Sequence, residues 1–267
     1  MFTNISYFFE KHYLKGNVIY RGRFCVKCFK AEPERRITVK HTYELSVIIR
    51  ELLSGNKKAF QDLYDLTAND FYFHTRMIVN NDEEAARLIV KIYKSMAMRL
   101  NRLQKPEDAV KWMNGIMYGH LMDWMNVHCS TMLMDEEMGR FDQMPSVPVV
   151  LGGSTMFTEA ETAALAANYI SQLPEVHAIT GLAYFYDNIE LQETAELLQC
   201  DDTRISVRAK YAIKLIESYC KDYAKQNNVE IQPIDTHLLL LAYVLLAKDC
   251  VLPGKRELYF DIAQAIS

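Results

Sequence analysis

The sequence predicts an all-α protein, and three observations support this. Glycine and proline are scarce, with 10 and 7 among 267 residues, whereas β-rich folds need many turn residues. Half of the residues are apolar and 24% are charged, which suits a chain that buries a substantial core. From residue 42 onward, apolar residues recur mostly at three- and four-residue spacing, the period of an α-helix.

Residues 1–41 are predicted to be a basic N-terminal extension. Nine basic residues stand against two acidic ones between Lys11 and Lys40. Residues 16–40 show partial alternation of β-branched and aromatic residues around a break at KAEPE, which is typical of a small β-hairpin. Two interpretations stay open: the basic charge is neutralised by acidic surface elsewhere in the chain, or it is available to nucleic acid.

A first helical domain is predicted over residues 42–125. Gly55 and Asn56 mark a corner between two helices. Asp82 and Glu83 suit the positive end of the next helix dipole. Pro106 opens a further helix as its first residue. Trp112 and Trp124 lie in that helix and are interpreted as core anchors rather than as base-stacking platforms.

The remaining chain divides into a linker over 126–158, a second helical domain over 159–224 and a helical tail over 225–267. The longest apolar run is Leu238–Ala247, and a membrane span needs about 20 such residues. No signal peptide is recognised at the N-terminus. We therefore expect a cytoplasmic protein that has reduced cysteines and makes no membrane contact. The apolar tail is expected to dock onto one helical domain.

The segment LQETAELLQCDDTRISVRAKYAI, from Leu191 to Ile213, predicts a helix-turn-helix. Ile205, Ala209 and Ala212 fall on one face of its second helix. Ala195 in the first helix is small enough for the two helices to cross closely. Gln199 stands in the turn, where glycine is usual. This geometry leaves the second helix free to enter a major groove.

The sequence around this segment resembles bacterial RNA polymerase sigma factors of the extracytoplasmic-function type. The segment LPEVHAITGLAYFYDNIELQETAELLQ contains Leu173-Pro174, an apolar helix that ends in aromatic residues, and a helix with Glu193 in the family register. The segments NDEEAARLIVKIYKSM and KPEDAVKWMNGIMYGHLMDWM similarly resemble helices of the family's other conserved region.

This resemblance implies binding to core RNA polymerase and promoter DNA, with no catalysis and no cofactor. It places polymerase contacts in the helix that carries Arg87, Val90 and Lys91, although the family usually has Asp, Gln and Glu there. It assigns capture of single-stranded DNA to Arg99, Asn101, Arg102 and Lys105. It assigns duplex contacts to Arg204, Ser206, Arg208, Lys210 and Lys214, with Arg208 ranked first.

Charge favours a second hypothesis of a different class. Residues 159–224 hold eleven acidic against five basic residues, and acidic surface repels phosphate. Asp201 and Asp202 lie at the start of the second helix of the helix-turn-helix. The alternative is a degenerate sigma-like module that works through protein contacts without reading DNA, and its partner would be an anti-sigma or other regulatory protein, or another sigma factor. A continuous basic strip on that helix would favour DNA binding, and an acidic or covered face would favour protein contact.

No metal site and no enzyme activity are predicted. Cys25 and Cys28 have the spacing of half a zinc site, but only His12 and His41 lie near them in sequence, and zinc needs four ligands. We interpret the two cysteines as ordinary hairpin residues. The sequence lacks phosphate-binding loops, zinc-protease motifs and nucleophile elbows.

Overall fold

The computed structural model describes residues 9–14, 17–22, 40–129 and 156–266. A small antiparallel sheet joins β1 (Phe9–Leu14) to β2 (Asn17–Gly22), with Phe9 opposite Gly22. The described chain that follows is overwhelmingly helical, which confirms the all-α class. Cys25, Cys28 and most of the predicted linker lie outside the described residues.

In the described part of the chain, four α-helices precede the predicted linker, and we call them the N-terminal helix group. They are α1 (Lys40–Leu53), α2 (Ala59–Val79), α3 (Asp82–Arg99) and α4 (Ala109–His128). Two short 3-10 turns, η1 (Leu100–Arg102) and η2 (Pro106–Asp108), connect α3 to α4. Asn80 adopts a left-handed φ of 49°, and the Asn81 side chain accepts a hydrogen bond from the Glu84 amide at 2.9 Å. These two residues end α2 and begin α3.

The second group, which we call the C-terminal helix group, includes the predicted helix-turn-helix. Its elements are α5 (Glu159–Ile170), α6 (Glu175–Gly181), η4 (Leu182–Tyr186), α7 (Leu191–Leu197) and α8 (Asp202–Asn227). A capping box between Thr158 and Glu161 begins α5. The η4 segment is π-helical and continues directly from α6.

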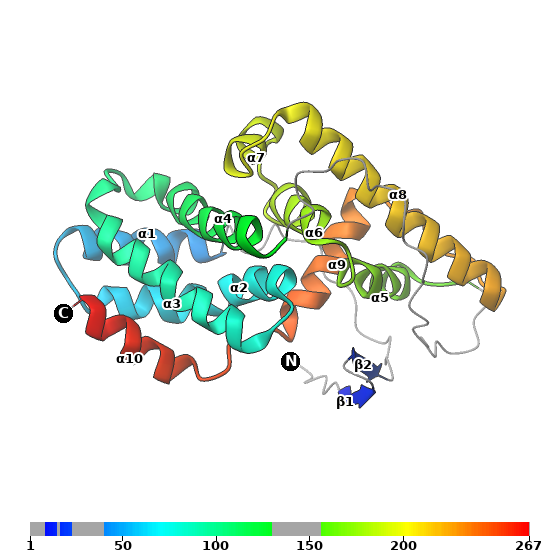
Figure 1. Cartoon of the computed structure of the whole chain (residues 1–267), viewed down its shortest axis with the longest axis horizontal. Helices are drawn as coiled ribbons and strands as arrows, with labels where there is room; N and C mark the ends of the chain where they lie inside the picture. Colours follow the sequence, from blue (N-terminus) through cyan, green and yellow to red (C-terminus); the bar gives the residue numbers. More distant parts are fainter. Residues whose placement is uncertain (1–8, 15–16, 23–39, 130–155, 267) are drawn as a thin grey trace.

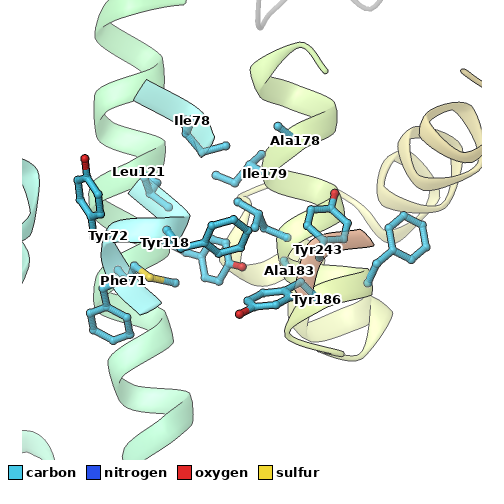
Figure 2. Packing of buried hydrophobic residues seen from close by; sticks show 14 of the residues in the cluster. Phe71, Tyr72, Ile78, Tyr118, Leu121, Ala178, Ile179, Ala183, Tyr186 and Tyr243 are labelled. Atoms are coloured by element: carbon cyan, nitrogen blue, oxygen red, sulfur yellow. The ribbon is translucent and has the colours of Figure 1, made fainter. Parts of the chain in front are cut away.

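The two helix groups share one continuous core. Helix α2 packs against α6, and α4 packs against α7. Figure 2 shows Ile78 and Leu121 of the first group facing Ile179 and Ala183 of the second. All four side chains are buried. Contact between the groups therefore buries apolar surface on both sides, which stabilises their association.

The C-terminal tail contacts both groups, whereas the sequence predicted docking onto one. Helix α9 (Thr236–Lys248) packs on α5 and η4. Helix α10 (Lys255–Ile266) runs beside α3 on the side away from α4 (Figure 1) and also contacts α2. Among the helices that the structure describes, none is long and apolar enough to cross a membrane.

Candidate functional site

The predicted strand-capturing residues lie together on the connection between α3 and α4. Arg99, Asn101, Arg102 and Lys105 are all exposed. Leu103, in the middle of the connection, is 4% exposed and anchors it to the core. Its amide also donates a hydrogen bond to the Leu100 carbonyl at 3.0 Å. The buried leucine holds the loop against the protein while its cationic neighbours face solvent.

Two helices joined by a short turn, α7 and α8, form over the segment predicted as a helix-turn-helix. Ile205, Ala209 and Ala212 are buried, and Lys210 is exposed. Gln199 takes the left-handed conformation, with φ of 52°. The amide of Cys200 donates to the Ala195 carbonyl at 3.0 Å, and that of Gln199 donates to Glu196 at 3.3 Å. This pair of bonds is a Schellman motif that ends α7.

The exposed face of α8 lacks one of the five predicted duplex residues. Arg208 is 8% exposed, and its Nη1 atom lies 3.9 Å from the Cys200 sulfur. The guanidinium of Arg208, which the sequence ranked first among the duplex contacts, therefore points into the helix-turn-helix and not to the exposed face of α8. Tyr211, three residues further along α8, is half-buried.

The other four predicted duplex residues keep at least partial solvent access. Lys210 and Lys214 are exposed, and Ser206 is half-buried. Arg204 is exposed, but its Nε atom lies 3.4 Å from the Asp201 carboxylate. Asp201 also caps α8 by accepting from the Arg204 amide at 2.8 Å. The positive charge available to a phosphate is therefore centred on the two lysines.

The predicted polymerase residues lie along one side of α3. Arg87 is exposed and donates to Glu83 at 2.8 Å and to Glu84 at 3.0 Å. Lys91 is exposed, whereas Val90 is half-buried and packs against the core. The cationic replacements that distinguish this helix from the family pattern are therefore on its surface. Trp112 and Trp124 are partly buried against the core, in line with their predicted role as anchors.

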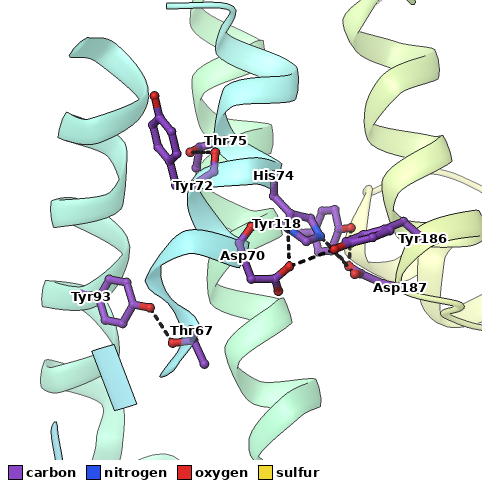
Figure 3. A network of polar contacts seen from close by, with 9 residues as sticks. All are labelled: Thr67, Asp70, Tyr72, His74, Thr75, Tyr93, Tyr118, Tyr186 and Asp187. Atoms are coloured by element: carbon purple, nitrogen blue, oxygen red, sulfur yellow. Dashed lines mark hydrogen bonds and ion pairs between the residues drawn. The ribbon is translucent and has the colours of Figure 1, made fainter. Parts of the chain in front are cut away.

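A buried polar network between the two helix groups was not predicted. His74 of α2 is 1% exposed, and its Nε2 atom lies 3.1 Å from both carboxylate oxygens of Asp187, which directly follows η4. Tyr118 of α4 donates to the same carboxylate at 2.7 Å. Tyr186 reaches back to donate to Asp70 of α2 at 3.2 Å. Figure 3 shows these side chains converging from three helical segments.

The hydrogen bonds of His74 favour the charged imidazolium. Its Nδ1 atom lies 2.8 Å from the Asp70 carbonyl, which can only accept, so Nδ1 carries a proton. Its Nε2 atom faces a carboxylate, which is also an acceptor when ionised. Burial lowers the pKa of His74, but the carboxylates of Asp187 and Asp70 outweigh burial and raise it from 6.5 to about 9. The network is thus a buried ion pair at neutral pH.

His177 of α6 has the opposite electrostatic setting. It is 9% exposed, and its ring lies 4.9 Å from that of Tyr211. Burial lowers the pKa of His177, and the nearby positive charge of Arg208 lowers it further. The buried guanidinium of Arg208 and a neutral imidazole therefore lie together where α6 packs against α8.

Within the ranges 40–129 and 156–266, no three His, Cys, Asp or Glu side chains form a cluster suited to a metal ion. No protein-family model and no curated protein matches the chain.

Proposed function

We propose that this chain is a sigma-like transcription initiation factor, which acts in the cytoplasm by binding core RNA polymerase and promoter DNA and has no catalytic activity. The connection between α3 and α4 carries the proposal. Arg99, Asn101, Arg102 and Lys105 project into solvent from it, at the place where the resemblance puts the strand-capturing loop. Exposed cations on a short anchored loop attract the phosphates of an unpaired strand.

The other contacts divide between the two helix groups. The exposed side of α3 with Arg87 and Lys91 would contact the polymerase, and Lys210 and Lys214 of α8 would contact duplex phosphates. Co-purification of the chain with core RNA polymerase, followed by sequencing of the bound DNA, tests this proposal. We expect the polymerase subunits and a recurring upstream sequence to be recovered. Recovery of neither would contradict the proposal.

Salt titration resolves the loop contacts. Each phosphate contact on a single strand contributes about 0.7 to the slope of the logarithm of affinity against the logarithm of salt. We expect the double variant Arg99→Ala/Arg102→Ala to lower this slope by about 1.4 on single-stranded DNA. The matched control is Lys57→Ala/Lys58→Ala, which removes the same charge from exposed positions at the α1–α2 corner. Equal salt slopes for the two variants would show that the loop does not contact DNA.

Duplex binding is tested on the two exposed lysines of α8. We expect Lys210→Ala/Lys214→Ala to lower the duplex salt slope by about 1.8 if both side chains contact phosphate. Arg208→Ala is unsuitable for this test, because the side chain is buried and its loss would disturb the fold.

The burial of Arg208 specifically favours a second candidate function. With Arg208 inside and Asp201 beside Arg204, the α8 face lacks the continuous basic strip of a DNA reader. The second candidate is a regulatory module that binds an anti-sigma or other regulatory protein without reading DNA. An unchanged duplex slope in Lys210→Ala/Lys214→Ala, together with recovery of a protein partner but no enriched DNA sequence, would favour this candidate.

A further inference from the structure

The C-terminal tail spans the contact between the two helix groups. In Figure 1 it leaves α9, beside α5, and continues into α10, which lies along α3 at the other side of the molecule. The tail is therefore a covalent connection from the C-terminal helix group to the N-terminal helix group.

The α9 part of the tail is deeply buried. Leu238, Leu239, Ala242 and Tyr243 are each at most 2% exposed. Gly181 of α6 makes room for the Tyr243 hydroxyl, because a methyl group at this glycine would collide with it. The preceding segment is also held, since the Gln232 side chain donates to the Phe157 carbonyl at 3.0 Å. These contacts fix α9 to the C-terminal helix group.

Polar contacts attach the joint between α9 and α10 to α2. The Leu252 amide donates to the Asn69 side chain at 3.1 Å, and Leu252 itself is 2% exposed. Tyr64 donates to the Lys255 carbonyl at 2.8 Å. Gly254, with φ of 61°, allows the chain to turn into α10.

Helix α10 itself is held by a smaller apolar contact than α9. Of its side chains in the described part of the chain, Ile262 is the fully buried one, at 0% exposed. Tyr259 packs on Tyr64 at 5.2 Å between ring centroids and remains half-buried. Phe260 faces solvent at 67% exposed. Since burial of apolar area stabilises docking, α10 is expected to detach more readily than α9.

We infer that the tail is a strap that holds the two helix groups closed, with α9 as its fixed anchor and α10 as its releasable end. While α10 lies on α2 and α3, the tail contacts the C-terminal helix group through α9 and the N-terminal helix group through α10. When α10 leaves, the groups are joined by their direct contacts, by the linker and by the contact of Leu252 with Asn69 of α2. Release of α10 therefore lets α2 separate from α6 and η4.

Amide hydrogen exchange on the full chain tests this inference with a matched pair of variants. Ile262→Asp places a charge in the buried contact of α10, whereas Phe260→Asp makes the same charge change on the exposed face of the same helix. We expect Ile262→Asp to raise exchange in α10 at least tenfold, and to raise it severalfold in α6 and η4. Exchange in α5 and α9 should keep the wild-type rate. Phe260→Asp should match the wild type throughout.

Two results would overturn the inference. If α10 exchanges freely in Ile262→Asp while α6 and η4 stay protected, α10 does not hold the groups together. If α9 and α5 lose protection as much as α10, the tail has no fixed anchor. Should Ile262→Asp fail to fold, Tyr259→Ala removes the ring contact with Tyr64 without burying a charge. The same two readings apply to that variant.

Discussion

The Nε2 atom of His74 lies 3.1 Å from the carboxylate of Asp187, although 113 residues separate them in the chain. One residue belongs to α2 and the other follows η4, so this ion pair joins the two helix groups. His74 is 1% exposed and the Asp187 side chain 13% exposed. A pair this buried is strongly destabilising to break, since the remaining charge keeps no partner of equal strength.

We therefore expect Asp187→Ala to lower the free energy of unfolding by about 3 kcal/mol at pH 7. Urea denaturation measures this loss. Glu196→Ala is the control, because Glu196 is an exposed carboxylate on α7, and its removal should change stability by less than about 0.5 kcal/mol. A loss for Asp187→Ala no larger than that of the control would contradict a stabilising role for the pair.

The pH dependence of stability should reveal the charge on His74. Its pKa is raised from 6.5 to about 9 in the folded protein, so the folded state binds the proton more tightly than the unfolded state. The stabilisation is complete below pH 6.5 and is lost as pH rises through about 9. We expect His74→Gln to be less stable than the wild type at pH 6, and the difference to shrink towards pH 9.5. Denaturant titrations across this range measure the effect; a constant difference would mean that His74 is not charged.

His177 should act in the opposite direction. Burial and Arg208 lower its pKa below 6.5, so below that pH the unfolded state binds the proton more readily than the folded state. Stability is lost as pH falls below 6.5. We expect His177→Phe to reduce the loss of stability between pH 6.5 and 5, measured as a shift in thermal unfolding temperature. If the unfolding temperature falls by the same amount between pH 6.5 and 5 in His177→Phe and in the wild type, the protonation of His177 does not change on unfolding.

Two buried tyrosines offer a matched test of hydrogen bonding. Tyr118 is fully buried and donates to Asp187 at 2.7 Å. Tyr243 is 1% exposed, and its hydroxyl has no hydrogen-bond partner among the described residues. We expect Tyr118→Phe to lower the free energy of unfolding by about 2 kcal/mol, because it removes a hydrogen bond to a charged group. Tyr243→Phe should leave stability unchanged or raise it. Equal losses in chemical denaturation would disprove this distinction.

The turn of the helix-turn-helix offers a stabilising change. Gln199 has φ of 52°, a conformation that costs a residue with a side chain roughly 1–2 kcal/mol. Because the side chain is exposed, Gln199→Gly removes strain without opening a cavity. We expect the free energy of unfolding to rise by about 1 kcal/mol. Gln192→Gly, in the helical part of α7, should instead destabilise by about 1 kcal/mol. The two variants changing stability in the same direction would refute the backbone explanation.

The sequence by itself determined the helical class and the inward face of α8. Helical period is a local property, so the spacing of Ile205, Ala209 and Ala212 was enough to identify the buried stripe. The solvent exposure of Arg99 and Lys105 likewise follows from a short polar connection between two apolar helices.

Only the tertiary structure decided what the flanks of the helices contact. Arg208 lies at the edge of the apolar stripe, and its burial depends on neighbouring elements rather than on its own spacing. The pairing of His74 with Asp187 joins residues far apart in sequence, and no local pattern encodes such a contact. The same holds for the tail: its apolar composition required burial, but the helices that cover it were set by how the two groups pack together.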